Sequence, residues 1–218
     1  MTFDVSAFNV QKFDRILKKG LSQGLGKRGG RVCVEAAICQ VLGLPHGDDP
    51  GCVADSVRSY KIYLNDASWS SPAARARGLR GLGLAQLGSK GVVNDQEFIL
   101  RMAEKTIRVI IPLLFQEVFP KNQKCLDAAR RCQEKGTKEA AQAAASAAYA
   151  AWMAGETSAA WAAWMAAASA ARAASAAWAA KEAAKAAKEA GNKYLILSAK
   201  LALETLEELN SPGVKLLS

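Results

Sequence analysis

The chain has 218 residues, half of them hydrophobic, which is enough for one or two globular units with a buried core. Its net charge of +9 suits an anionic or acidic partner, but basic and acidic residues are interspersed, which argues against a dedicated nucleic-acid-binding patch. Few residues are strongly β-forming and alanine dominates the second half, so the composition favours an all-α fold and disfavours sheet-based classes.

Apolar residues recur at helical spacing in five segments of the glycine-rich first half. Ser71 is a predicted N-cap, and Pro72 fits the first turn of the helix that follows. Pro112 is expected to kink the last of these helices or to end it near Ile111. The β-branched residues at 31–34 leave a short strand open there, although the apolar pattern favours a helix. The predicted helical segments are residues 8–24, 31–44, 52–66, 68–88 and 94–119.

The alanine-rich region, residues 119–218, begins at a change of composition near Phe119–Pro120, and residues 1–118 form the other predicted region. Four further helices are predicted after this boundary, each opened by a polar cap. Their short connections are typical of an array of antiparallel helical hairpins, and the two regions could pack as one globular unit. The predicted helices are 122–136, 137–155, 156–191 and 192–210, with Thr137, Thr157 or Ser158, and Asn192 as caps, and Gly136, Gly155 and Gly191 as stops.

Two charge-free runs, 140–155 and 157–171, are shorter than the roughly 18 apolar residues that a membrane span needs, so no span is expected. The high helix propensity of alanine also disfavours disorder. Large and small residues recur at steps of three and four, which predicts a stripe packed between helices; a ligand-binding or interface role is the alternative. The stripe comprises Trp161, Trp164, Ala168, Ala171, Ser175 and Trp178.

The segment GKRGGR, residues 26–31, precedes a predicted helix and combines glycines with three cations. Backbone N–H groups at a helix start bind anions, and glycine lets a ligand approach closely. The segment lacks the Gly-Lys-Ser/Thr ending of a Walker A loop. It predicts either a phosphate or nucleotide contact or an ordinary solvated basic loop. The residues concerned are Lys27, Arg28, Gly29, Gly30 and Arg31.

The segment PHGDDPGC contains the sole histidine, His46, beside Asp48 and Asp49. Carboxylates with a histidine can hold a metal ion or perform acid–base chemistry. The loop is similar to the Asp-rich metal-binding loops of all-α ADP-ribosylglycohydrolases, which would imply a metal-dependent hydrolase. Asp, Gly and Pro are also ordinary turn residues, so a plain turn is the alternative.

A third mixed segment, residues 60–78, joins aromatic, amide and basic side chains. Lys61, Asn65, Trp69 and Arg75 could recognise a nucleotide by stacking and phosphate contacts. The alternative is a loop anchored by Trp69 beside a solvated helix. With a single histidine in the chain, a Ser-His-Asp triad has no support.

Pro120 is followed by Leu126, by the Ala-Ala-Arg sequence that ends at Arg130, by Gly136 and by a long Ala/Trp run. Over about residues 110–210 this order resembles the alanine-rich immunity proteins of bacteria (the Imm5-like family). The resemblance implies a small protein of microbial conflict that works by binding and blocking. It supplies no catalytic residues, and Cys132 stands where an aromatic residue is more usual.

The leading hypothesis is a non-enzymatic protein of bacterial or phage conflict that inhibits a defence or toxin protein by direct binding. A sponge for an anionic nucleotide signal and, less favoured, a metal-dependent hydrolase are the alternatives. We expect no cofactor, no membrane partner and no nucleic acid, and a homo-oligomer stays open. The polar start MTFDVSAFN and five cysteines without a CxxC pair predict reduced thiols in the cytoplasm, or in the host cytoplasm for a phage protein.

Overall fold

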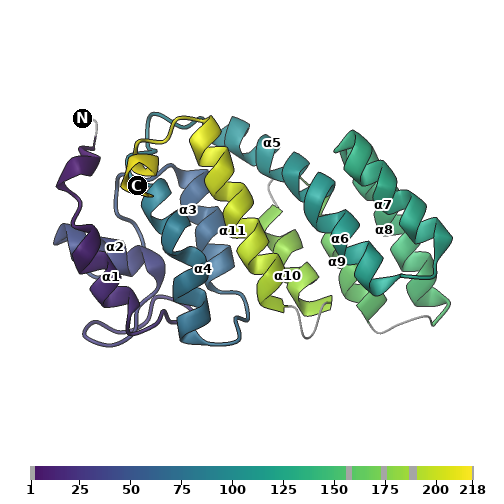
Figure 1. The fold of residues 1–218 in the computed structure, drawn as a ribbon, viewed down its shortest axis with the longest axis horizontal. Coiled ribbons are helices and arrows are strands. Elements are labelled where there is room, and N and C mark those ends of the chain that lie inside the picture. The colour runs from purple at the N-terminus through teal and green to yellow at the C-terminus, as the bar shows by residue number, and fades with distance from the viewer. Residues whose placement is uncertain (1–2, 156–158, 173–175, 187–190, 218) are drawn as a thin grey trace. The chain divides into compact units, whose positions relative to one another are not determined.

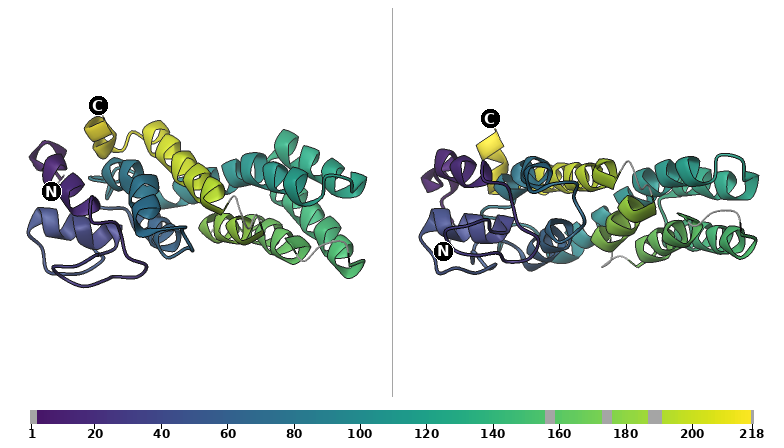
Figure 2. Two further views of the ribbon diagram at one scale, coloured as in Figure 1. Left: turned by 60° about the horizontal axis from the view of Figure 1, so that its bottom comes forward. Right: turned by 90° about the horizontal axis from the view of Figure 1, so that it is seen from below.

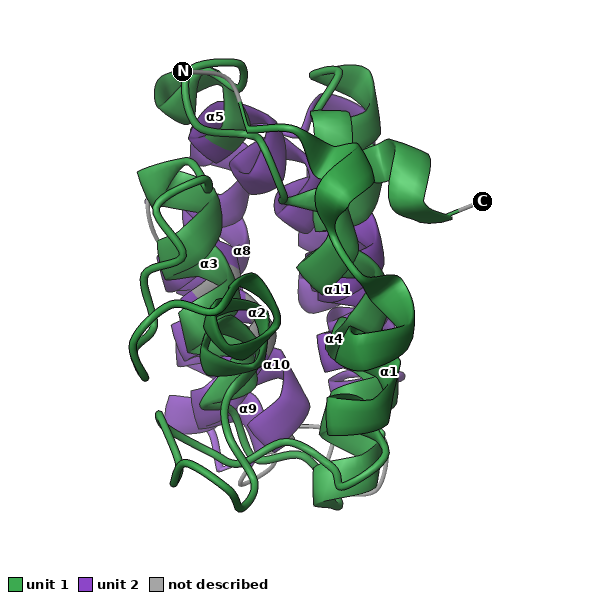
Figure 3. Ribbon diagram, turned by 90° about the vertical axis from the view of Figure 1, so that its left-hand side faces the viewer, with its two compact units in different colours: residues 1–98, 202–218 green, residues 99–201 purple. Residues whose placement is uncertain are grey.

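The computed structural model describes residues 3–155, 159–172, 176–186 and 191–217. These residues form helices and turns with one isolated antiparallel bridge, so the predicted all-α class is confirmed (Figure 1). Two compact units are present: unit 1 comprises residues 1–98 and 202–218, and unit 2 comprises residues 99–201 (Figure 3). Unit 2 therefore begins before the change of composition at Phe119–Pro120. No helix within the described ranges has the length and hydropathy needed to cross a bilayer.

Unit 1 is organised around α2, against which α1, α3 and α4 all pack. Phe13, Ile38, Leu64 and Leu79 are fully buried in its core. The C-terminal 3-10 turn, Pro212–Leu217, packs against α4 in the same unit. The helices of this unit are α1 (Val10–Leu17), α2 (Val34–Leu42), α3 (Asp55–Asn65) and α4 (Pro72–Ala85).

Unit 2 stacks its helices in chain order: α6 packs on α7, α7 on α8, α8 on α9 and α9 on α10 (Figure 2). The helix α5 begins in unit 1 and continues into unit 2, and α11 runs from unit 2 into unit 1. Short connections join α7 to α8 as the hairpin pattern predicts. The helices are α5 (Asp95–Lys105), α6 (Ile111–Val118), α7 (Gln123–Lys135), α8 (Lys138–Met153), α9 (Ala159–Ala170), α10 (Ala176–Ala186) and α11 (Gly191–Glu208).

The predicted caps at Ser71 and Thr137 are present. Ser71 Oγ accepts the N–H of Ala74 at 3.0 Å, and Thr137 Oγ1 accepts the N–H of Ala140 at 3.3 Å. These bonds satisfy backbone donors that have no partner inside the first turn of a helix. Gly136 closes α7 in the left-handed conformation with φ 65°, as the stop signal predicted.

The disruption expected at Pro112 takes the form of a π-helical stretch, Thr106–Ile110, between α5 and α6. Proline has no N–H, and its ring clashes with the carbonyl four residues earlier, which is that of Arg108. The wider π turn falls on this residue, so the helical path continues through Pro112 without ending at Ile111.

The single helix predicted over residues 156–191 is wrong. The structure contains two helices there, since α9 ends at Ala170 and α10 begins at Ala176. No glycine or proline marks this break in the sequence. The helix α11 starts at Gly191, so Gly191 is not a stop and Asn192 is not a cap. The predicted caps Thr157 and Ser158 lie outside the described residues.

Candidate functional site

The predicted anion loop is the tip of a tight hairpin closed by a bridge between Gly26 and Val32. Lys27 N–H donates to the Arg31 carbonyl, and Gly30 N–H donates to the Lys27 carbonyl, both at 3.0 Å. Because these two donors are used within the turn, they are not free to cradle an anion. The whole loop between the bridge residues is exposed, including its three cationic side chains.

The start of α2 is closed by protein groups and does not form the open anion site expected from the sequence. Cys33 Sγ accepts the N–H of Ala36 at 3.3 Å, and Asn65 Oδ1 lies 3.4 Å from the N–H of Val34. All four of these residues are buried. These backbone donors at the helix start are thus not accessible to an anion. Within this motif, the cationic side chains of the hairpin are the groups that an anion could still contact.

A pocket of about 110 Å³ lies between the hairpin and the loop that follows α2. Arg28 and His46, which belong to separate motifs in the sequence, both line this pocket. His46 Nε2 is 3.3 Å from the carbonyl oxygen of Gly26, which joins the two loops. The remaining wall comes from Val32, Ala36, Gln40, Gly43 and Leu44.

The side chains of Asp48 and Asp49 make contacts that hold the loop after His46 in place. Asp48 Oδ1 lies 3.7 Å from Arg58 Nη1, and Asp49 Oδ1 accepts the N–H of Gly51 at 2.9 Å. The second contact is the turn role that aspartate commonly fills. In the part of the chain that the structure describes, no three His, Cys, Asp or Glu side chains are grouped to hold a metal ion. The arrangement gives no support to the predicted metal site at these residues.

Asn65, Trp69 and Arg75 are buried and do not form the expected recognition surface. Trp69 Nε1 donates to a carbonyl at the end of α3 at 2.8 Å. Arg75 donates to two backbone carbonyls of the flanking loops at 3.0 and 3.2 Å, and Asn65 Nδ2 donates to a third at 3.0 Å. These side chains fix the loops of unit 1, because each satisfies backbone acceptors that have no helical partner.

Lys61 is also buried, in an ion pair that the sequence did not reveal. Its Nζ lies 2.6 Å from Glu35 Oε1, and both side chains are at most 1% exposed. Gln86 Nε2 donates to the other carboxylate oxygen of Glu35 at 3.1 Å. Burial raises the pKa of Glu35 and lowers the pKa of Lys61. Lys61 lies four residues after Val57 and three before Leu64, and this spacing is the signal that could have placed it on the core face of α3.

The predicted tryptophan stripe is not the packed face of unit 2. Alanines fill that face: α8 buries six of them, and the buried alanines of α9 lie four and three residues apart. Trp161 and Trp178 are exposed instead, and Trp164 is half-buried. Small side chains let helices approach closely, so the rings are carried outside the contact. Ser175 lies outside the described residues. The buried alanines of α9 are Ala160, Ala163, Ala166, Ala167 and Ala170.

Four of the rings of α8 and α9 form one cluster on the surface. Trp161 makes edge-to-face contacts with Trp152 and Trp164, with ring centroids 4.7 and 4.5 Å apart. Tyr149 lies 5.7 Å from Trp152 and 5.4 Å from Trp164, which closes the group. Tyr149 and Trp161 are each 43% exposed, and the neighbouring Met153 is 64% exposed. We call Tyr149, Trp152, Trp161 and Trp164 the aromatic cluster.

No family model, curated protein or solved structure matches this chain. Among the described residues, the structure offers two candidate sites, the aromatic cluster of unit 2 and the pocket of unit 1. They differ in chemistry, because the first is uncharged and the second is lined by a guanidinium and an imidazole.

Proposed function

We propose that the protein is a non-enzymatic binding protein that captures a protein partner through the aromatic cluster and blocks that partner's activity. The cluster of four packed rings, with Tyr149 and Trp161 exposed and Trp152 and Trp164 half-buried, carries this proposal. Tryptophan and tyrosine dominate protein-binding hot spots because they bury a large area with few rotatable bonds. An apolar patch left open to solvent on a folded unit is a typical interaction site.

The support beneath the aromatic cluster favours a rigid binding face. Six alanines of α8 and five of α9 are buried, and the two helices pack on each other, so the rings stand on a closely packed hairpin. Their mutual contacts also restrict their rotamers before binding. A surface that is ordered in advance loses less conformational entropy in the complex, which favours tight binding.

The charges around the aromatic cluster indicate the chemistry of the partner. Glu156, which lies outside the described residues, is the only charged residue in the sequence between Glu139 and Arg172. An apolar surface on the partner would match such a face. The net charge of +9 would attract an acidic protein over a longer distance. A partner with an apolar centre and acidic surroundings fits both properties.

The biological setting that we propose is conflict between bacteria, or between bacteria and phage. It rests on the resemblance of residues 110–210 to alanine-rich immunity proteins, a range that contains the whole aromatic cluster. Immunity-type proteins act by occupying a toxin or a defence protein. The partner would then be such a protein, and no catalytic group is required of this chain.

Capture from bacterial lysates with three versions of the protein tests the proposal. The versions are wild type, Trp161→Ser in the aromatic cluster and Trp178→Ser as the matched control, since Trp178 is an exposed tryptophan of α10 outside the cluster. We expect one protein to be enriched by wild type and by Trp178→Ser and lost with Trp161→Ser. Circular dichroism should show equal helicity for all three.

The activity of the captured protein decides whether binding also blocks it. Wild type should inhibit that activity in proportion to the complex formed, and Trp161→Ser should not. Identical capture by wild type and Trp161→Ser would refute the aromatic cluster as the interface. A captured protein that stays fully active in the complex would refute the inhibitory role.

A further inference from the structure

The basic hairpin of unit 1 is not used by the proposed protein-binding function. Among the described residues, Lys27, Arg28 and Arg31 make no ion pair or side-chain hydrogen bond. Three like charges within five residues repel one another, and an anion bound among them would remove this repulsion. Loop residues of this kind commonly carry a binding role, because the scaffold beneath them already holds the fold.

The pocket beside the hairpin provides a cavity in which a ligand could contact one of these cations. Arg28 of the hairpin and His46 of the loop after α2 both line the pocket, and the contact between His46 Nε2 and the Gly26 carbonyl joins the two loops. A guanidinium offers paired N–H donors whose geometry matches two oxygens of a phosphate. His46 Nε2 is already used by the Gly26 carbonyl, so Nδ1 is the imidazole nitrogen left for a ligand, and it donates when it carries a proton.

The rest of the pocket is suited to an organic group. Val32, Ala36 and Leu44 present an apolar wall, and Leu44 is 40% exposed although it is a large hydrophobic residue. Gln40 supplies one amide that can both donate and accept. A volume of about 110 Å³ accommodates one phosphate and the atoms next to it, so the rest of a mononucleotide would extend out of the pocket along its apolar rim.

Negative charge near the pocket is balanced by protein partners or outnumbered by the hairpin cations. The C-terminal end of α2 would repel an anion, but Lys12 Nζ donates to the Val41 carbonyl there at 3.2 Å. Asp48 faces Arg58, whereas Asp49 accepts a backbone N–H and keeps its negative charge, which the three hairpin cations outnumber. The hairpin cations therefore determine the sign of the local potential.

We propose that the pocket between Arg28 and His46 binds a small phosphate-bearing molecule. The phosphate lies between the guanidinium and the imidazole, with Lys27 and Arg31 adding long-range attraction, and the organic part lies on the wall of Val32 and Leu44. The ligand class is a phosphorylated metabolite or mononucleotide, with free inorganic phosphate as the other source of the same chemistry. This site is independent of the aromatic cluster, so either proposal can fail alone.

Calorimetric titration of the full-length protein with AMP, adenosine and inorganic phosphate tests this site. We expect AMP to bind with one-to-one stoichiometry, adenosine not to bind, and added salt to weaken the affinity for AMP. Arg28→Gln and His46→Gln should each weaken AMP binding about tenfold or more, as expected when a hydrogen bond to a charged group is lost. Inorganic phosphate binding as tightly as AMP would also support the site and would identify the free anion as its ligand.

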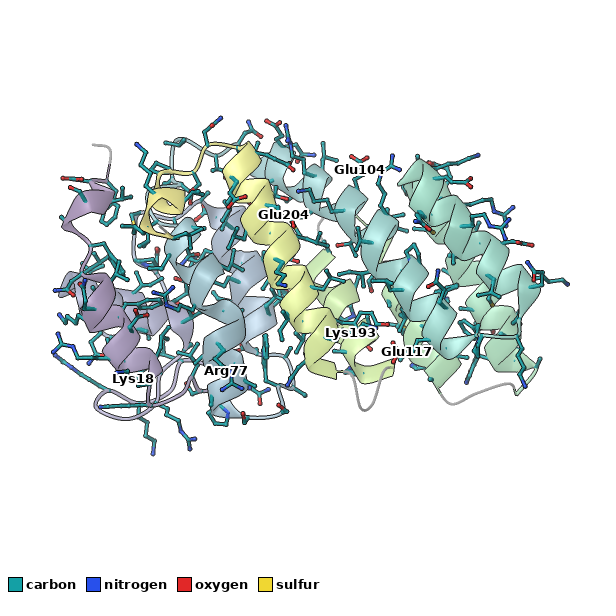
Figure 4. All side chains as sticks on the ribbon, viewed as in Figure 1. Lys18, Arg77, Glu104, Glu117, Lys193 and Glu204 are labelled. Atoms are coloured by element: carbon teal, nitrogen blue, oxygen red, sulfur yellow. The ribbon has the colours of Figure 1, made fainter. Side chains whose placement is uncertain are left out.

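The matched control is Arg77→Gln, because Arg77 is an exposed arginine of α4 outside the pocket lining (Figure 4). This variant should bind AMP like wild type, and all variants should keep the wild-type Tm. Absence of saturable binding of both AMP and phosphate would overturn the proposal. An equal loss of affinity in Arg77→Gln would also overturn it, since the attraction would then come from net charge alone.

Discussion

The side chain of Arg108 lies directly over Gly136 and closes the C-terminal end of α7. Its guanidinium donates to the carbonyls of Gln133, Glu134 and Lys135 at 2.7 to 3.0 Å. These carbonyls have no partner within the helix, so the arginine satisfies them and also places a cation at the negative end of the helix dipole. A Cβ built on Gly136 would be only 2.5 Å from Arg108 Nε.

Gly136→Ala is expected to destabilise the protein for two reasons. Its φ of 65° costs a non-glycine residue about 1 kcal/mol, and the new methyl group displaces Arg108 from the three carbonyls. Gly155→Ala is the control, because Gly155 has φ 76° but no atom within 4 Å of a new Cβ. Urea unfolding should show a loss at least about 1 kcal/mol larger for Gly136→Ala.

The difference between the two glycine variants should depend on the arginine. In an Arg108→Ala background, we expect Gly136→Ala to cost no more than Gly155→Ala. Equal losses of unfolding free energy for both glycine variants in the wild-type background would contradict this expectation. They would show that the Arg108 side chain moves aside at no cost.

Breaking the buried ion pair of Glu35 and Lys61 should lower the free energy of unfolding far more than breaking an exposed ion pair. Lys61→Met leaves Glu35 buried without its cation, and we expect a loss of about 3 to 5 kcal/mol. Arg80→Met breaks the contact between Arg80 Nε and Asp14 Oδ1, which is nearly as short at 2.7 Å but joins side chains that are 36 to 41% exposed. This loss should cost at most about 1 kcal/mol. Chemical denaturation measures both.

A double variant separates the two possible reasons for the loss at Lys61. Replacing Glu35 by Leu together with Lys61→Met removes both charges, so much of the stability should return. If the double variant were as unstable as Lys61→Met, the lost packing of the lysine chain, not an unpaired charge, would explain the effect.

Tyr194 is fully buried in unit 2, and its hydroxyl donates to Glu117 Oε2 at 2.7 Å. Lys193 Nζ lies 3.5 Å from the same oxygen (Figure 4). Burial, with the Glu117 carboxylate as a second cause, raises the pKa of Tyr194 above its ordinary value of 10.0. Because the folded state holds this proton more tightly, the contribution is complete below pH 10 and is lost as the pH rises through the raised pKa.

Tyr194→Phe should therefore lower the stability at pH 7 by about 1 to 2 kcal/mol and flatten its decline in alkali. Tyr63→Phe, at a half-exposed tyrosine, should leave both unchanged. Unfolding free energies measured from pH 8 upward provide the comparison. An alkaline decline of the same steepness in Tyr194→Phe and wild type would contradict the assignment.

All five cysteines are buried, which predicts slow reaction with a thiol reagent. Burial raises the pKa of Cys39 to about 11 and that of Cys132 to about 12, so little thiolate exists at pH 8. Ellman's reagent should label the native protein slowly and label all five thiols at once in denaturant. Ala150→Cys places a thiol at an exposed site of α8 as a fast reference. A native thiol that reacts at this reference rate would contradict the burial of that residue.

Local signals in the sequence were sufficient for most helix ends. Ser71, Thr137 and Gly136 act through bonds and dihedral angles within a few residues, so they are readable without the fold. The break after Ala170 is different, because the residues around it favour helix and no local group opposes one. Tertiary packing determines where a helix ends at such a position, and the local sequence pattern does not predict it.

The choice of buried face in α9 was also beyond the sequence. Trp161 and Trp164 lie on one stripe, and Ala160 and Ala163 lie on the next, one residue earlier in each turn. Every candidate stripe in this helix is apolar, so the hydrophobic pattern does not distinguish between them. The close approach of α8 selects the smaller side chains, which a rule based on hydrophobicity alone assigns to the surface.

For the polar residues of the candidate sites, too, the sequence did not show which side chains are buried. Lys61, Asn65 and Arg75 have the composition of a nucleotide-binding surface, yet burial makes them part of the scaffold. Arg28 and His46 are 18 positions apart and meet only because the hairpin folds toward the loop after α2. In both cases the residue types in the sequence indicated the kind of ligand that could bind. Which side chains are accessible, and which lie close together, required the fold.

The separation of alanine from tryptophan in unit 2 bears on how this protein can evolve. A buried alanine between close helices tolerates almost no substitution, because any larger side chain would force them apart. The rings lie outside that alanine contact, although they touch one another across α8 and α9. A single ring can therefore be exchanged while the buried alanines keep the helices in place. Under the proposed binding role, substitutions in the aromatic cluster could change its partner while the helical framework stays the same.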